Sequence, residues 1–235
     1  MSLPFFYIDS PIQAAHIVLN EETSKHIGQV LRMQSGEQIH LTDGYGNLYL
    51  AEITDNHRKK CSVSIIRTQT ISASNNSVTI AISLIKNASR FEWFIEKATE
   101  LGVTEIIPLL CDRTEKQSFK IDRIKTIAIS AMLQSKQCYL PQISEPIRFK
   151  KIIEQDNFQQ KFIAHCEEGK EKKQLSTFAS SSNSSSIILI GPEGDFSIDE
   201  IQTAIQNNFV PVSLGDTRLR TETAGVAAAA LLCLV

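Results

Sequence analysis

The residues with the clearest chemical potential lie in a turn near the C-terminal end of the chain. An apolar run at 187–190 leads into 191–196, which reads Gly-Pro-Glu-Gly-Asp-Phe. Ser197 and Glu200 follow with the spacing of a capping box, which predicts a helix from Ile198. A glycine-containing turn between a strand and a helix lets a ligand approach the backbone closely. A tight turn that binds nothing needs the same glycines, so this segment alone leaves both interpretations open.

A second polar segment also leaves a strand and enters a helix. Residues 214–224 read Leu-Gly-Asp-Thr-Arg-Leu-Arg-Thr-Glu-Thr-Ala and follow an expected strand at 210–214. Helix capping would explain Thr221 or Thr223, but capping does not require the two neighbouring arginines. Ligands of open α/β sheets bind at the carboxyl ends of the strands. The two polar turns therefore predict one shared pocket.

The pocket is not expected to be a common phosphate or metal site. No Gly-Lys-Ser/Thr follows the glycines, which excludes a Walker loop, and the Gly-x-Gly-x-x-Gly fingerprint of dinucleotide binding is absent. Histidine, cysteine and aspartate residues do not cluster with the spacing of metal ligands, so we expect no metal.

The two turns belong to a region of alternating strands and helices, which predicts a parallel sheet covered on both faces. The helix at 91–101 places Phe91, Phe94 and Ile95 on one side, and Gly102 fits its C-terminal stop. A Ser-rich loop is expected at 180–186. The other expected elements are strands at 78–85, 105–110, 161–166, 187–190 and 210–214, and helices at 121–137 and from about Thr223.

The N-terminal region is predicted to be a small β-barrel, because several short strands surround only one helix, at 21–32. A hairpin turn is expected at 43–47, which reads Asp-Gly-Tyr-Gly-Asn. Residues 71–77 are small and polar, which predicts domains at 1–72 and 73–235. The expected strands are 5–8, 38–42, 48–53 and 61–68.

Composition indicates an ordinary globular protein, with 42% hydrophobic and 21% charged residues. A net charge of −2 argues against a strongly basic nucleic-acid coat, although 86–150 has a small basic excess. No apolar run approaches the length of a membrane helix, and no secretory signal is visible. Five scattered cysteines without a Cys-x-x-Cys pair predict free thiols in a cytoplasmic protein.

Taken together, the two turn segments closely resemble the RsmE family, the 16S ribosomal RNA (uracil-N3)-methyltransferases of the SPOUT superfamily. The resemblance runs along the whole chain. The other residues that match the family pattern are 26–32 (His-Ile-Gly-Gln-Val-Leu-Arg) with Gly36, Asp43-Gly44 with Gly46, Lys86, 96–103 (Glu-Lys-Ala-Thr-Glu-Leu-Gly-Val) with Pro108, and Gln134-Ser135 with Pro141.

The chain departs from the family pattern at a few positions. Asp195 stands where a second glycine is usual, and Thr217-Arg218 replaces a more common Arg-Ile pair. Lys136 stands in place of an arginine, after Met132-Leu133 in place of a Glu-containing pair. Leu3-Pro4 lacks the basic residue common before the Phe-Phe pair. These departures concern RNA contacts more than the cofactor site.

The resemblance implies an α/β protein with an N-terminal PUA-like β-barrel and a C-terminal SPOUT α/β trefoil-knot methyltransferase domain. Knots are so rare that periodicity alone would have indicated an ordinary doubly wound sheet. The resemblance also implies S-adenosyl-L-methionine as the cofactor, a homodimer with the pocket near its interface, and 16S ribosomal RNA of the small ribosomal subunit as the partner and substrate.

The same resemblance implies roles for individual residues. Arg220 would favour the anion formed when uracil N3 loses its proton, and Glu222 is a candidate for the catalytic base. The expected cofactor-binding residues are His165, Cys166, Ile190, Gly191, Pro192, Glu193, Gly194, Leu214, Gly215, Leu219, Arg220, Thr221, Thr223 and Ala224. The expected RNA-binding residues are His26, Arg32, Lys86, Arg90, Lys97 and Arg218.

Three alternatives stay open from the sequence. One is another SPOUT enzyme that methylates a ribose 2′-hydroxyl or a different base. A second is a non-catalytic RNA-binding or ribosome assembly protein that kept the fold, which would not bind S-adenosylmethionine. A third is an unrelated nucleotide-binding enzyme, which would bind a nucleoside triphosphate.

Overall fold

The computed structural model describes residues 3–115, 118–167, 172–178 and 184–234. The chain divides into two compact units. Unit 1 consists of Met1–Ala73 and Met132–Leu140, and unit 2 of Ser74–Ala131 and Pro141–Val235. The sequence alone had assigned 132–140 to the second domain. Within the described chain, no helix is both long and apolar enough to cross a membrane.

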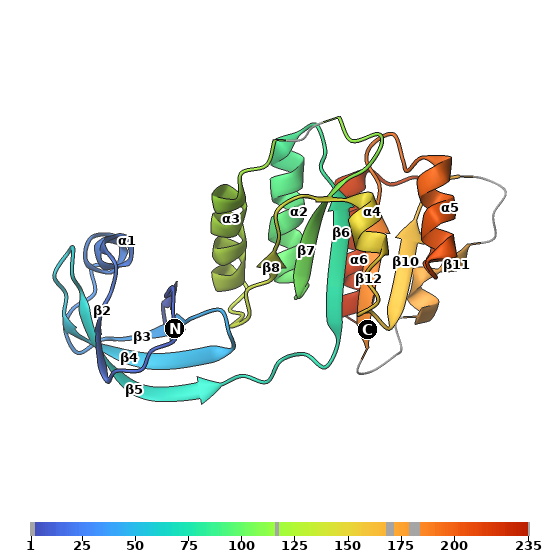
Figure 1. The fold of residues 1–235 in the computed structure, drawn as a ribbon. Helices are drawn as coiled ribbons and strands as arrows, with labels where there is room; N and C mark the ends of the chain where they lie inside the picture. The colour runs from blue at the N-terminus through green and yellow to red at the C-terminus, as the bar shows by residue number, and fades with distance from the viewer. Residues whose placement is uncertain (1–2, 116–117, 168–171, 179–183, 235) are drawn as a thin grey trace. The chain divides into compact units, whose positions relative to one another are not determined.

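Unit 1 is built on a curled five-stranded sheet in the order β1-β3-β4-β5-β2 (Figure 1). The strands are β1 (Phe5–Tyr7), β2 (His16–Val18), β3 (Gln38–Thr42), β4 (Asn47–Asp55) and β5 (Ser62–Thr70). The expected hairpin at 43–47 is confirmed, because β3 and β4 pair antiparallel on either side of it. Register shifts interrupt the β4–β5 ladder at two points and help the sheet to curl. Alternate side chains fill the core, among them Ile39, Leu41, Ala51 and Ile53.

The single helix expected at 21–32 is wrong in its type and its end. Asn20 caps a short α-helix, α1 (Glu21–Lys25), and the chain continues as a π-helix, η1 (His26–Val30). Gly28 lies in this wider turn, where a Cβ atom would stand 3.3 Å from the backbone oxygen of Asn56. Sequence reasoning also missed β2, since three residues are too few for a periodic pattern.

Two segments that carry the family resemblance meet within unit 1. The Gly46 amide donates to the carbonyl of Cys138 at 2.8 Å, and the Leu140 amide donates to that of Gly44 at 2.9 Å. Gly44 and Gly46 have φ angles of 77° and 91°, and a Cβ atom at Gly46 would overlap the Tyr139 ring. The hairpin therefore needs glycine both for its backbone conformation and for the close approach of 138–140.

Unit 2 is an α/β domain around a parallel sheet in the order β11-β13-β10-β12-β6-β7-β8, with β9 also paired to β7. The strands are β6 (Ser77–Ser83), β7 (Glu105–Leu110), β8 (Gln142–Ile143), β9 (Ile147–Arg148), β10 (Gln160–Ala164), β11 (Lys173–Gln174), β12 (Ser185–Ile190) and β13 (Val210–Ser213). The helices are α2 (Ala88–Glu100), α3 (Ile121–Gln134), α4 (Phe149–Ile153), a 3₁₀ turn η2 (Leu175–Phe178), α5 (Ile198–Gln206) and α6 (Thr221–Cys233).

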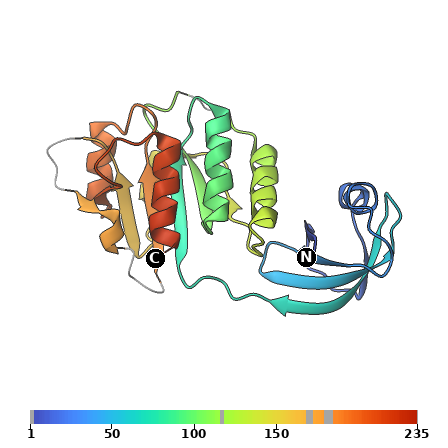
Figure 2. The same ribbon diagram turned by 180° about the vertical axis from the view of Figure 1, so that it is seen from behind.

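Helices cover the two faces of this sheet. Helices α4 and α5 lie on one face, and α2 and α6 lie on the other, as Figures 1 and 2 show from opposite sides. Phe149, Ile152 and Ile201 pack with Ile163 and Leu189 of the sheet in a fully apolar core. On the other face, α6 packs against β6 and β12, so the predicted parallel sheet with two covered faces is confirmed.

Sequence signals for helix ends were accurate where side chains close the turns. The capping box of Ser197 and Glu200 starts α5 at Ile198, and Gly102 follows the end of α2 with a φ angle of 87°. Neither Thr221 nor Thr223 is the N-cap of the last helix, because Arg220 holds that position without a side-chain bond. Part of the expected Ser-rich loop, 180–183, lies outside the described residues, and β12 already begins at Ser185.

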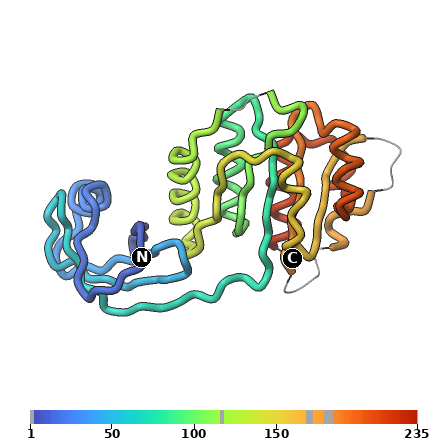
Figure 3. The backbone as a smooth tube through the Cα atoms, viewed as in Figure 1, coloured from blue at the N-terminus to red at the C-terminus, as the bar shows by residue number. Residues whose placement is uncertain are grey.

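The last helix returns to the middle of the domain. Strand β13 pairs with β10 towards one edge of the sheet, whereas α6 packs against α2, β6 and β12 (Figure 3). The segment 214–220 makes this return. The trefoil knot that the resemblance implies would form in this part of the chain, and it stays a prediction.

Candidate cofactor pocket

Three neighbouring strands end at the same level, which brings the predicted polar turns together. Ala164 at the end of β10 pairs in register with Ile190 at the end of β12 and with Val212 near the end of β13. The turns that follow these residues therefore leave the same edge of the sheet. Carboxyl ends of parallel strands are the usual ligand site of such sheets.

A cavity of about 490 Å³ lies at this edge, and a second of about 390 Å³ shares several of its walls. Volumes of this size suit a cofactor-sized ligand. The first is lined by Arg90, Ala164, Cys166, 190–193, Asp195, 218–222 and Ala224. The second is lined by 164–166, Lys172, 212–219 and Ala224. The predicted cofactor residues line one or the other, except Gly194 and Thr223.

The Gly-Pro-Glu-Gly turn is shaped mainly by contacts within the protein. A Cβ atom at Gly191 would stand 3.1 Å from both the ring and the backbone nitrogen of Phe196, so glycine allows close packing here. A Glu193 carboxylate oxygen accepts the Lys86 backbone amide at 3.0 Å, and Arg113 donates to the Gly194 carbonyl at 2.7 Å. These bonds fix the turn before any ligand binds.

Asp195, where the family usually has glycine, ties two of the pocket loops together. One carboxylate oxygen accepts the Cys166 backbone amide at 2.7 Å, and the other accepts the Phe196 amide at 2.8 Å. Its φ angle is 63°, in the left-handed region that favours glycine. The sequence showed that aspartate replaces the usual glycine at this position. It did not predict that the Asp195 side chain would hold the loop after β10.

Replacing Asp195 with alanine is expected to weaken cofactor binding about tenfold, because the Cys166 turn loses a charge-assisted hydrogen bond. Titration calorimetry with S-adenosylhomocysteine measures the affinity. Asp195→Gly also removes the carboxylate but suits the backbone conformation, so it separates the lost bond from strain. An alanine variant with unchanged affinity would show that the bond does not shape the pocket.

The start of α6 brings the two candidate catalytic residues to the pocket. Arg220 is exposed at the N-cap, whereas Glu222 is buried in the first turn of the helix. Arg90 of α2 lies 3.6 Å from the Glu222 carboxylate. Arg90 was predicted to contact RNA, but in this structure it is an ion-pair partner of the candidate base. Arg218 lines both cavities and is exposed.

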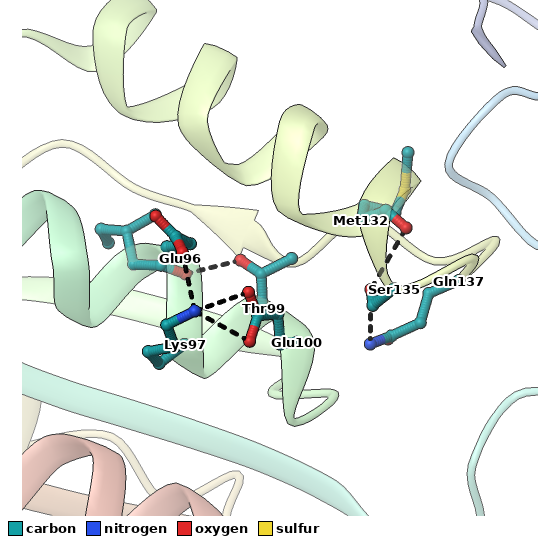
Figure 4. Close-up of polar contacts among 8 residues, drawn as sticks. Glu96, Lys97, Thr99, Glu100, Met132, Ser135 and Gln137 are labelled. Carbon is teal, nitrogen blue, oxygen red and sulfur yellow. Dashed lines mark hydrogen bonds and ion pairs between the residues drawn. The ribbon is translucent and has the colours of Figure 1, made fainter. Parts of the chain in front are cut away.

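The other residues predicted to bind RNA differ in whether acidic side chains neutralise their charge. The Lys97 ammonium lies 2.7 Å from Glu96 and 2.9 Å from Glu100 (Figure 4), and these hydrogen-bonded carboxylates raise its pKa, Glu96 most. Lys97 is therefore a poor candidate for binding phosphate. Lys86 pairs with Glu115 at 3.2 Å, and both side chains are well exposed.

In unit 1, His26 and Arg32 are both exposed, in and just after η1. The His26 ring packs edge-on against Phe6 at a centroid distance of 5.7 Å. Arg32 has a φ angle of 55°. Among the described residues of this unit, neither side chain forms an ion pair, whereas Lys59 pairs with Glu21.

The described part of the chain holds no group of three or more histidine, cysteine, aspartate or glutamate residues that could bind a metal. The expectation that no metal is needed stays a prediction.

Cys166 is expected to be the thiol that reacts first in the native protein. It is exposed and lines the pocket, whereas burial raises the pKa of Cys61, Cys111, Cys138 and Cys233, the last to about 12. Because the thiolate is the nucleophile, those four stay protonated and slow near neutral pH. Peptide mapping after brief treatment with iodoacetamide identifies the modified residue.

Bound S-adenosylhomocysteine is expected to slow this labelling, because Cys166 would lie under the ligand. The Cys166→Ser variant serves as the control and should lose the fast reaction. Equal labelling with and without the ligand would place the cofactor elsewhere.

The two units and the pocket belong to a class of protein, the RNA methyltransferases that carry a PUA domain. The family models that match describe an RNA methyltransferase domain over residues 72–233 and an RNA methyltransferase PUA domain over residues 19–66.

The chain belongs to the RsmE family within this class. Ribosomal RNA small subunit methyltransferase E of Synechocystis is 32% identical, over 92% of this chain and 72% of its own length. The Rickettsia conorii protein of the same name is 31% identical, over 89% and 86%. The predicted family is thus confirmed, and so is the predicted fold of a PUA-like β domain followed by an α/β methyltransferase domain.

Solved structures agree over nearly the whole chain. A probable rRNA-methyltransferase from Porphyromonas gingivalis is 37% identical, with a TM-score of 0.89 over 97% of this chain and 95% of that one. Ribosomal RNA small subunit methyltransferase E of Neisseria gonorrhoeae, bound to S-adenosyl methionine, is 28% identical, with a TM-score of 0.82 over 97% and 96%.

Proposed function

We propose that this protein transfers a methyl group from S-adenosylmethionine to N3 of one uridine in 16S ribosomal RNA of the small ribosomal subunit. The main support is structural. Three polar turns meet at one edge of the sheet, around cavities of about 490 and 390 Å³. The names of the curated relatives and the ligand of the Neisseria structure support the substrate and the cofactor.

The residues present suit this cofactor. The pocket has an apolar wall formed by Ile190, Pro192 and Leu219. The backbone of the surrounding turns provides hydrogen-bond donors and acceptors for an adenine. The carboxylates of Glu193 and Asp195 already accept backbone amides, so we assign them to holding the turns. The remaining predicted residues of both cavities would contact the cofactor directly.

Bound, the cofactor supplies a methyl group on a positively charged sulfonium. Uracil N3 gives its proton to a base and bonds to the methyl carbon while the carbon–sulfur bond breaks, which leaves a neutral thioether. We assign Arg220 to the anion that develops on the uracil, because an adjacent cation stabilises it. Glu222 is the proposed base, with Arg90 holding its carboxylate at 3.6 Å.

We further propose that residues 1–72 form an RNA-binding domain and 73–235 the methyltransferase domain, and that two copies form a homodimer. Trp93 of α2 and Leu234 after α6 are 43% and 67% exposed, and contact with a second copy would cover them. An enzyme with this substrate would work in the cytoplasm. Light scattering of the purified protein tests the dimer.

The proposal is tested by methyl transfer from labelled S-adenosylmethionine to small subunits isolated from cells that lack this protein. Digestion to nucleosides should yield labelled 3-methyluridine. Label on a ribose or on another base would keep the enzyme class and overturn the target atom. Failure to bind the cofactor and to transfer label would favour a non-catalytic assembly protein.

A further inference from the structure

Unit 1 contains a cavity that shares no residue with the proposed cofactor pocket. Its volume is about 550 Å³. Strands β1, β3 and β4 each contribute one residue, and 136–139 after α3 closes the other side. The lining consists of Leu3, Phe5, His40, Leu48, Ile71, Lys136, Gln137, Cys138 and Tyr139.

Aromatic rings form fixed walls of this cavity. The rings of Phe5 and His40 lie edge to face at 6.4 Å. The Tyr139 hydroxyl donates to the Ile71 carbonyl at 2.8 Å, and its ring lies against Gly46. Tyr139 is nevertheless 37% exposed, so its ring is held in place without being covered. Rigid, open aromatic walls suit a flat ligand that stacks.

The charge of the lining favours a ligand with an anionic group. Lys136 is exposed and forms no ion pair with the described side chains, and none of the lining residues is acidic. Gln137 donates to the Ser135 hydroxyl, which in turn donates to the Met132 carbonyl (Figure 4), so the loop that carries Lys136 is itself ordered. A flat apolar body with an attached phosphate matches both properties.

We propose that this cavity binds one unstacked nucleotide of the RNA substrate, with its base among Phe5, His40 and Tyr139 and its phosphate at Lys136. The inference rests on the proposed function for the presence of RNA. Proteins commonly recognise single-stranded RNA by stacking splayed bases on aromatic side chains beside basic residues. The nucleotide would anchor the RNA at unit 1, apart from the uridine that receives the methyl group.

The first test uses the full-length protein and a single-stranded RNA octamer that carries one 5-iodouridine. After irradiation, mass spectrometry identifies the crosslinked residue. We expect crosslinks at Phe5, His40 or Tyr139. Crosslinks confined to other residues of unit 1, or to unit 2 alone, would overturn the inference. This readout needs no variant and does not depend on methyl transfer.

The second test fills the cavity. Leu48→Trp is expected to weaken binding of the octamer about tenfold, in the range of one lost stacked base. Ile66→Trp is the matched control, because Ile66 is 50% exposed on β5 and does not line the cavity. Lys136→Gln should lower the slope of log affinity against log salt by about one. Thermal unfolding checks that the variants are folded.

The outcomes separate this inference from the proposed function. If Leu48→Trp binds RNA as the wild type does while 3-methyluridine still forms, the nucleotide site is wrong and the enzyme stands. If crosslinks appear in the cavity but no methyl group is transferred, the site stands and the proposed reaction fails. A cavity that rejects the octamer but binds an apolar peptide would also overturn the inference.

Discussion

The Arg220→Ala variant is expected to lower kcat/KM for methyl transfer to small subunits about a hundredfold. Arg220 lies at the N-cap of α6, lines the larger cavity and is exposed, so its charge can face a bound uracil. Its loss removes the cation proposed to stabilise the N3 anion, whereas the apolar and backbone walls of the pocket remain. Single-turnover kinetics with labelled S-adenosylmethionine measure the rate of the chemical step.

Matched variants show whether the effect belongs to this position. Arg220→Lys keeps a positive charge and should recover part of the rate. Arg218→Ala removes an equally exposed arginine two residues away and should affect RNA affinity more than the rate. An Arg220→Ala enzyme within threefold of the wild-type rate would remove Arg220 from the proposed chemistry.

The Gly225→Val variant is expected to lower the free energy of unfolding by about 3 kcal/mol, the upper part of the range for overpacked cores. Gly225 is buried in α6, and a Cβ atom there would stand 2.6 Å from a ring carbon of Phe94 and 2.8 Å from Ile82. Glycine is a poor helix residue by about 1 kcal/mol, so its presence here reflects how closely α6 approaches α2. A side chain would force the two helices apart.

Urea unfolding followed by tryptophan fluorescence measures this change. The chain has one tryptophan, Trp93, which lies in α2 beside Phe94, so the signal reports on unit 2. Ala227→Val places the same side chain at a partly exposed position of α6 and should cost less than 1 kcal/mol. Equal stability of Gly225→Val and the wild type would show that α6 has room to move.

Much of the fold could be predicted because its signals are local. The strand at 105–110 and the start of α5 match their predicted bounds, since β-branched runs and a capping box act within a few residues. Short elements such as β8, β9 and α4 were missed, because two to five residues hold no periodic pattern. The addition of Met132–Leu140 to unit 1 was missed because it depends on contacts with a distant hairpin.

By itself, the sequence determined the family, the two polar turns and the strands and helices on either side of those turns. Residue type and spacing control such local structure directly. Only the tertiary structure decided how their side chains are used. Asp195 reaches Cys166 across two parallel strands, Arg90 of α2 meets Glu222 of α6, and Phe94 dictates a glycine at 225. These partners are far apart in the chain and are brought together by strand order and helix return, which no local pattern encodes.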